Sequence, residues 1–136
     1  MKIEIEFTKG KIPVTILSLQ GDLDASNFES VIARARDLYT EGTRHLLLDL
    51  SELRFMSSSG LVAMHSIVLL MRGADPHDLL EGWNTIHAID RDRASEPQSY
   101  VKILNPQPKV ANTLKMTGLD QFFEIYQDRQ KAIASF

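Results

Sequence analysis

The chain has 136 residues, of which 43% are hydrophobic, and a formal net charge of -3, values typical of a domain with one core and without the excess positive charge of a nucleic-acid-binding surface. It contains no cysteine, which excludes a disulfide framework, a thiol nucleophile and a cysteine-ligated zinc site. The longest apolar run, from Leu61 to Met71, falls short of the roughly 18 residues that span a bilayer.

The amino-terminal part of the chain predicts a hairpin followed by a helix. Residues 2–8 alternate between polar and apolar side chains, as in a strand with one buried face. A second apolar segment, residues 14–20, follows a glycine-containing turn and is expected to pair with the first strand in antiparallel fashion. Ser26 and Glu29 have the spacing of a capping box. We therefore expect a helix to begin there and to end near Gly42.

The middle of the chain predicts a buried strand and a long apolar helix. Residues 45–50 are almost wholly apolar without alternation, which indicates a central strand covered on both faces. The segment 51-SELRFMSSSGLVAMHSIVLLM-71 follows, and its apolar positions nearly encircle the helix expected from about Ser58 to Met71. That helix is therefore either deeply packed or in contact with a partner.

The carboxyl-terminal part returns to regular structure after a polar stretch. Residues 100–104 predict a strand, and Asn105 is the expected N-cap of a helix that ends at Gly118. Residues 122–126 predict a further strand, and Asp128 begins a last amphipathic helix.

This order of elements predicts an α/β fold, with a mixed central sheet of four to five strands and about four helices. We expect one domain over residues 1–136. Residues 73–99 are punctuated by glycine and proline and form an excursion from the core, a loop or a short helix around Trp83.

Three consecutive serines lie where a buried strand gives way to the long helix, at the edge of a parallel sheet where sites commonly form. One interpretation is structural: a serine oxygen caps the helix, and Gly60 allows close packing. The other is that a serine accepts a phosphoryl group, because the amide donors and positive dipole end of a helix tolerate an added phosphate. The residues concerned are Ser57, Ser58 and Ser59.

Other chemistries find little support. The sequence 56-MSSSGL-61 lacks the leading glycine of a hydrolase nucleophile elbow. There is no glycine-rich phosphate loop. His77 and His87, with nearby aspartates, fit no compact metal-ligand motif, so a solvated loop is expected there. We predict no metal, no cofactor and no catalytic residue.

Three separated segments resemble the STAS domain family, in particular the bacterial anti-sigma factor antagonists. The segment 44-RHLLLDLSELRFMSSSGL-61 is similar to the family's strand and serine signature, and 21-GDLD-24 is similar to its G-x-L-D. The segment 105-NPQPKVANTLKMTGLDQFF-123 resembles its helix ending in threonine-glycine-leucine. With the three in the family's order, the resemblance covers nearly the whole chain apart from residues 73–99.

The resemblance implies a STAS-like fold and a non-enzymatic switch in partner choice. Antagonists of this family bind an anti-sigma factor that is also a serine kinase, are turned off by phosphorylation, and are reset by a serine phosphatase. The family's acceptor maps to Ser58, with Ser59 beside it, and Asp24 is expected to help shape the site. Asp24 has an alternative interpretation as the turn residue that closes the second strand. We expect a cytoplasmic protein, since the amino end has no apolar run typical of a secretory signal.

The functional alternative is a STAS module without a phosphorylation cycle, one that binds a small ligand or serves a transporter or lipid-transfer system. One departure from the family bears on the choice, because Ser57 stands where the pattern has aspartate. The absence of this aspartate either eases introduction of the phosphate or impairs kinase recognition. The substitution also leaves the phosphate acceptor open between Ser57 and Ser58. The candidate docking residues, for which core packing is the alternative, are Phe28, Val31, Leu61 and Trp83.

Overall fold

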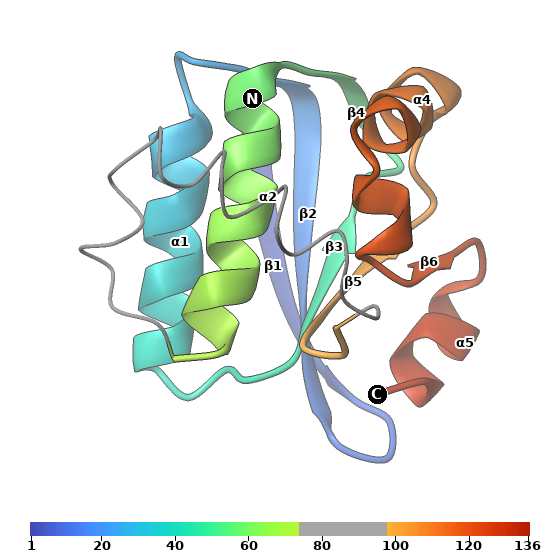
Figure 1. The fold of residues 1–136 in the computed structure, drawn as a ribbon. Helices are drawn as coiled ribbons and strands as arrows, with labels where there is room; N and C mark the ends of the chain where they lie inside the picture. The colour runs from blue at the N-terminus through green and yellow to red at the C-terminus, as the bar shows by residue number, and fades with distance from the viewer. Residues whose placement is uncertain (74–97) are drawn as a thin grey trace.

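The computed structural model describes residues 1–73 and 98–136. Figure 1 shows the arrangement of the helices and strands. Their bounds are β1 Lys2–Lys9, β2 Pro13–Leu23, α1 Phe28–Thr40, β3 Leu46–Asp49, β4 Leu53–Met56, α2 Ser58–Met71, β5 Val101–Leu104, α4 Pro108–Thr117, the 3-10 helix η2 Leu119–Gln121, β6 Ile125–Tyr126 and α5 Arg129–Ala134.

These elements form a mixed six-stranded sheet, which confirms the predicted fold class. The strand order is β1-β2-β3-β5-β6, and β4 pairs with the far end of β2. Among the strands of the described residues, only the hairpin β1–β2 is antiparallel, while the other pairs are parallel. The sheet has more strands than expected because β4, a strand of four residues, was not anticipated.

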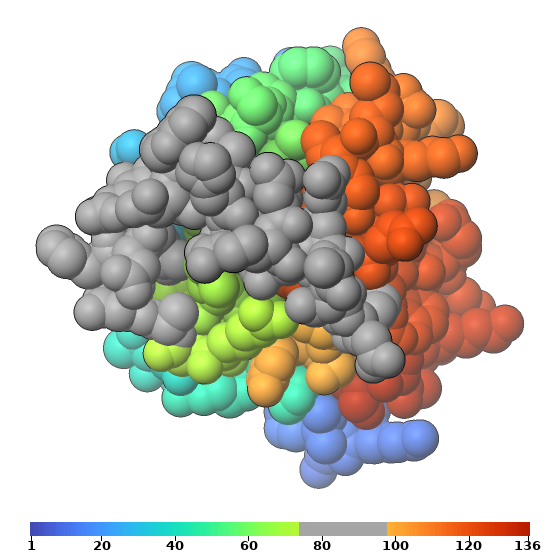
Figure 2. Space-filling view, in the orientation of Figure 1, coloured from blue at the N-terminus to red at the C-terminus, as the bar shows by residue number. Residues whose placement is uncertain are grey.

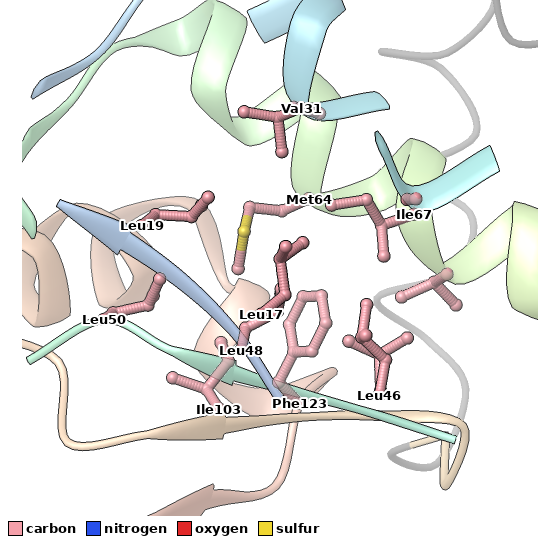
Figure 3. Packing of buried hydrophobic residues seen from close by; sticks show 14 of the residues in the cluster. Leu17, Leu19, Val31, Leu46, Leu48, Leu50, Met64, Ile67, Ile103 and Phe123 are labelled. Carbon is pink, nitrogen blue, oxygen red and sulfur yellow. The ribbon is translucent and has the colours of Figure 1, made fainter. Parts of the chain in front are cut away.

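The main core lies between the sheet and the helices α1 and α2, which run side by side over one face (Figure 1). Figure 3 shows Val31 of α1 and Met64 of α2 directed toward Leu17, Leu48 and Phe123. The three leucines of β3 are fully buried, as expected of a strand covered on both faces. On the other face of the sheet, side chains of β2, β3 and β5 pack with α5 in a smaller cluster: Val14, Ile16, Leu47, Leu104, Ala132 and Ile133.

Two helix starts differ from the predictions. The first helix has Asn27 as its N-cap, and the hydroxyl of Ser26 instead donates to the carboxylate of Asp24, so the expected capping box is absent. The N-cap of α4 is Gln107 rather than Asn105, which takes a positive φ of 50° just after β5. Pro108 then occupies the first turn, where its missing N–H costs nothing.

The carboxyl-terminal strand is shorter than expected. Phe122 and Phe123 are almost completely buried, but they follow the η2 turn and are not part of a strand. Of the predicted strand, residues 122–126, only Ile125–Tyr126 pairs with β5. The apolar segment thus serves core packing more than strand pairing. The last helix begins after Asp128, whose side chain accepts hydrogen bonds from two backbone amides, as predicted.

The helix expected around Trp83 and the histidines at 77 and 87 lie outside the described residues. Within residues 1–73 and 98–136, no helix has the length and apolar character needed to cross a membrane. Over the same ranges, no group of three or more His, Asp or Glu side chains is placed to hold a metal ion.

A buried lysine ties α5 to the sheet. Lys102 of β5 is 3% exposed. Its Nζ donates to the carbonyl oxygen of Ser135 at 2.9 Å and to the Ser135 hydroxyl at 3.0 Å, and it lies 3.3 Å from a Glu124 carboxylate oxygen. A buried ammonium group is costly without such partners. The charged Lys102 is therefore stabilised by the end of α5, and α5 is in turn held against the sheet by Lys102.

We expect Lys102→Met to lower the free energy of unfolding by about 1–3 kcal/mol, because it leaves a partly buried carbonyl without its donor. Urea denaturation measures the change, and hydrogen exchange should increase first in α5. Lys115→Met, at an exposed position of α4, is the control and should change stability by less than about 0.5 kcal/mol. Equal stability of the two variants would contradict the anchoring role.

Candidate functional site

The serines follow a bulge between β4 and β2. Leu53 pairs with Gly21 and Phe55 pairs with Asp22, so Arg54 is an extra residue on β4. Gly21 has a φ of +107°, a conformation that other residues rarely adopt. A bulge re-aims side chains, and here both Arg54 and Phe55 are exposed although they are neighbours in one strand. Strict alternation would have buried one of them.

The start of α2 is fixed to the end of β2. The amide of Ser57 donates to the carbonyl oxygen of Leu23 at 2.9 Å. Ser57 is the N-cap, and its Oγ accepts a hydrogen bond from the Gly60 amide at 3.4 Å. This confirms the structural interpretation for one of the three serines.

Ser58 and Ser59 form the first turn of α2 and differ from Ser57 in their contacts. Ser58 is exposed and Ser59 is half-buried. Within the part of the chain that the structure describes, neither hydroxyl makes a hydrogen bond. The first turn also carries no acidic side chain. A negative group added at Ser58 would therefore meet the positive end of the helix dipole without a carboxylate in the same turn.

Gly60 explains how the helix comes so close to the sheet. It is buried, and a methyl group in place of its hydrogen would lie 2.6 Å from Cγ of Met56 and 3.0 Å from Cγ of Leu23. Both distances are shorter than normal carbon–carbon contacts. The glycine thus permits the close packing predicted for it, and this packing fixes the height of the serines above the sheet edge.

Asp24 lies just beyond β2 at the same edge. Its Oδ1 accepts a hydrogen bond from the Ser26 amide at 2.9 Å and another from the Ser26 hydroxyl, and these bonds lower the pKa of the carboxyl group. Its own amide donates to the Asn27 side chain at 3.0 Å. Asp24 is thus ionised at neutral pH and shapes the turn before α1, in keeping with the turn interpretation. Its carboxylate makes no hydrogen bond to the three serines.

The proposed docking residues have different environments. Val31 is 0% exposed and belongs to the core, so its assignment to a docking surface is wrong: this side of α1 faces the sheet. Phe28 and Leu61 are partly buried and pack against the same core. Trp83 lies outside the described residues.

Comparison with protein families identifies the fold's relatives. A sequence model of the STAS domain matches residues 2–74, more than half of the chain. The chain belongs to the STAS domain family. The match includes the hairpin, both α1 and α2, and the serines. The comparison with curated proteins gives no match.

Solved structures support the assignment of this STAS domain at the level of the fold. The unphosphorylated form of the anti-sigma factor antagonist SpoIIAA aligns with a TM-score of 0.63 and 19% identity, covering 98% of this chain and 95% of that one. An anti-sigma factor antagonist from Mycobacterium paratuberculosis aligns with a TM-score of 0.63 and 16% identity, covering 98% and 93%. The phosphorylated form of the Bacillus cell fate determinant SpoIIAA gives 0.56 and 18%, covering 98% of both chains.

Sequence reasoning missed the strand β4 and, with it, the exposed pair Arg54 and Phe55. The segment Leu53–Met56 is only four residues long, and its sequence LRFM does not alternate between apolar and polar side chains as a strand with one buried face does. The turn at Ser51–Glu52, held by hydrogen bonds from Ser51 to Asp49, was the available signal that a new element begins.

We expect Gly60→Ala to lower the free energy of unfolding by about 1–2 kcal/mol. Overpacking against Met56 and Leu23 costs about 1–3 kcal/mol, of which the better helix propensity of alanine returns at most about 1 kcal/mol. Chemical denaturation measures the difference. Ser58→Ala changes an exposed position of the same turn and should stay within about 0.5 kcal/mol of the original chain. A Gly60→Ala protein as stable as the control would show that the contact is easily relieved.

Proposed function

We propose that the chain is an anti-sigma factor antagonist that switches partners through phosphorylation of Ser58. In its unmodified form it binds an anti-sigma factor that is also a serine kinase, and a serine phosphatase restores that form after phosphorylation. The single observation that carries the proposal is the exposed hydroxyl of Ser58 at the first turn of α2 in a STAS domain, which makes no hydrogen bond to any residue that the structure describes. The names of the structural relatives, which include an antagonist in both phosphorylation states, support the same role.

The contacts favour Ser58 over its neighbours as the acceptor. Ser57 uses its hydroxyl to cap the helix, and Ser59 is half-buried. Phosphorylation of Ser57 would remove a cap, whereas phosphorylation of Ser58 leaves the cap in place. The helix dipole stabilises an exposed negative group by about 0.3–1 kcal/mol, so the modified protein stays folded.

The added charge acts on partners rather than on the fold. A phosphate carries about -1.5 to -2 charges at neutral pH and imposes repulsion and desolvation on a surface fitted to a neutral hydroxyl. A loss of about 1.4 kcal/mol in binding free energy lowers affinity tenfold. A modest penalty is therefore enough to redirect a competition between two partners.

We expect Ser58→Ala to retain a serine kinase with the histidine-kinase-like ATPase fold, and Ser58→Asp to lose most of it. The aspartate places a negative charge where the partner meets a hydroxyl, and a loss of about tenfold in affinity is expected. The measurement is a pull-down from a lysate of the source cells with both variants as baits, followed by mass spectrometry. Lys11→Gln, which makes the same change of one unit in net charge at the exposed turn between β1 and β2, is the control and should behave as the unmodified chain.

The same experiment tests the alternative function. Equal recovery of transporter or lipid-handling proteins on the Ser58→Ala and Ser58→Asp baits, without a kinase, would contradict the partner switch. The serines would then serve helix capping alone.

The acceptor itself is tested by phosphate transfer. Incubated with the captured kinase and ATP, Ser57→Ala and Ser59→Ala should still take up phosphate, because each keeps the exposed Ser58 hydroxyl. Ser58→Ala should take up none. Mass spectrometry of the intact protein and of its peptides measures the uptake. Transfer to Ser58→Ala at the rate of the original chain would contradict the assignment of Ser58 as the acceptor.

A further inference from the structure

An exposed apolar and basic surface lies next to the serine site. Phe55 is 40% exposed, held outward by the bulge in β4, and it precedes Ser58 by three residues. The Nζ of Lys109, on α4, lies 5.8 Å from the centre of the Phe55 ring. A cation at this distance from an aromatic ring is attracted to its face. These contacts join β4 and α4 into one surface.

The same surface continues along α4. Residues 109, 112, 113 and 116 share one face because they are separated by three or four positions. Met116 is 78% exposed, the largest exposed fraction among the large hydrophobic residues described. The amide of Asn112 lies 3.7 Å from the Met116 sulfur. We define the α4 face as Phe55, Lys109, Asn112 and Met116. In Figure 2 the orange surface of α4 adjoins the green surface at the beginning of α2.

The α4 face carries one cation, Lys109, and no acidic residue. The segments Leu53–Met56 and Pro108–Thr117 contain Arg54, Lys109 and Lys115 and no acidic residue, whereas the chain carries -3 overall. Arg54 is partly balanced by Asp22, whose carboxylate lies 3.6 Å away. Asp22, the register partner of Phe55, is thus matched by Arg54, whereas Lys109 has no carboxylate partner among the described residues and is the unbalanced charge next to Phe55.

We propose that the α4 face docks an acidic segment of the anti-sigma factor, with apolar side chains of that segment packed on Phe55 and on Met116. This inference rests on the proposed function and adds to it a second contact region with defined chemistry. A flexible methionine and an aromatic ring beside a cation form a surface suited to a partner that is both apolar and negatively charged. The single unbalanced cation of this face is too few for tight binding to nucleic acid.

The α4 face gives the phosphate a second way to act. Ser58 follows Phe55 closely in the chain, so a phosphate there adds negative charge at the border of the surface. It repels the partner's carboxylates and competes with them for Lys109. The effect of the switch should therefore decrease as added salt screens these charges.

The test uses the anti-sigma factor captured by the Ser58→Ala bait and measures its affinity for purified variants by titration calorimetry at low and high salt. Lys109→Glu and Phe55→Ala should each weaken binding about tenfold or more. The loss for Lys109→Glu should shrink at high salt, whereas that for Phe55→Ala should persist. Lys11→Glu makes the same change in net charge at the exposed turn between β1 and β2, and should bind within twofold of the original chain.

The outcomes separate the two proposals. If the anti-sigma factor is captured but Lys109→Glu and Phe55→Ala bind it as well as Lys11→Glu does, the docking role of the α4 face is wrong and the proposed function stands. If no bait captures such a partner, the proposed function fails and the α4 face fails with it. Circular dichroism of each variant establishes that a loss of binding is not a loss of fold.

Discussion

The bond between the Ser57 amide and the Leu23 carbonyl oxygen ties together the elements on which the site depends. It joins the last residue of β2 to the N-cap of α2, directly beside the pair Leu23 and Met56 that closes the β2–β4 ladder. Gly60 completes the junction, because only a residue without a side chain fits above Leu23 and Met56. The position of Ser58 is thereby set by strand pairing and packing rather than by its own contacts.

This dependence explains why the location of the site could be predicted from the sequence and its shape could not. An apolar strand, a run of small polar residues and a long apolar helix define a strand-to-helix junction through local pattern alone. The bulge opposite Gly21 depends on pairing between segments about 30 residues apart, and no local pattern reports such pairing. Arg54 and Phe55 were therefore missed, although they lie only a few residues from the predicted serines.

The first residues of α1 and α4 also could not be predicted from local sequence alone. Ser26 and Asn105 have the chemistry of caps, yet Asn27 and Gln107 occupy those positions. Ser26 is engaged by Asp24, and Asn105 makes the turn out of β5 with a positive φ. In both places a preceding strand fixes where the chain can turn, and this constraint outweighs the preference of a single side chain.

Ser57 affects both the start of α2 and the charge beside Ser58. Serine and aspartate are both favourable N-caps, so a serine where the family resemblance has aspartate keeps the start of α2 intact. What changes is charge: the turn beside Ser58 loses a carboxylate, while the ionised Asp24 remains beyond the end of β2. A phosphate at Ser58 then meets less repulsion from its own protein. The repulsion that remains then acts mainly on a partner docked beside Ser58, which is the proposed role of the face that carries Lys109 and Phe55.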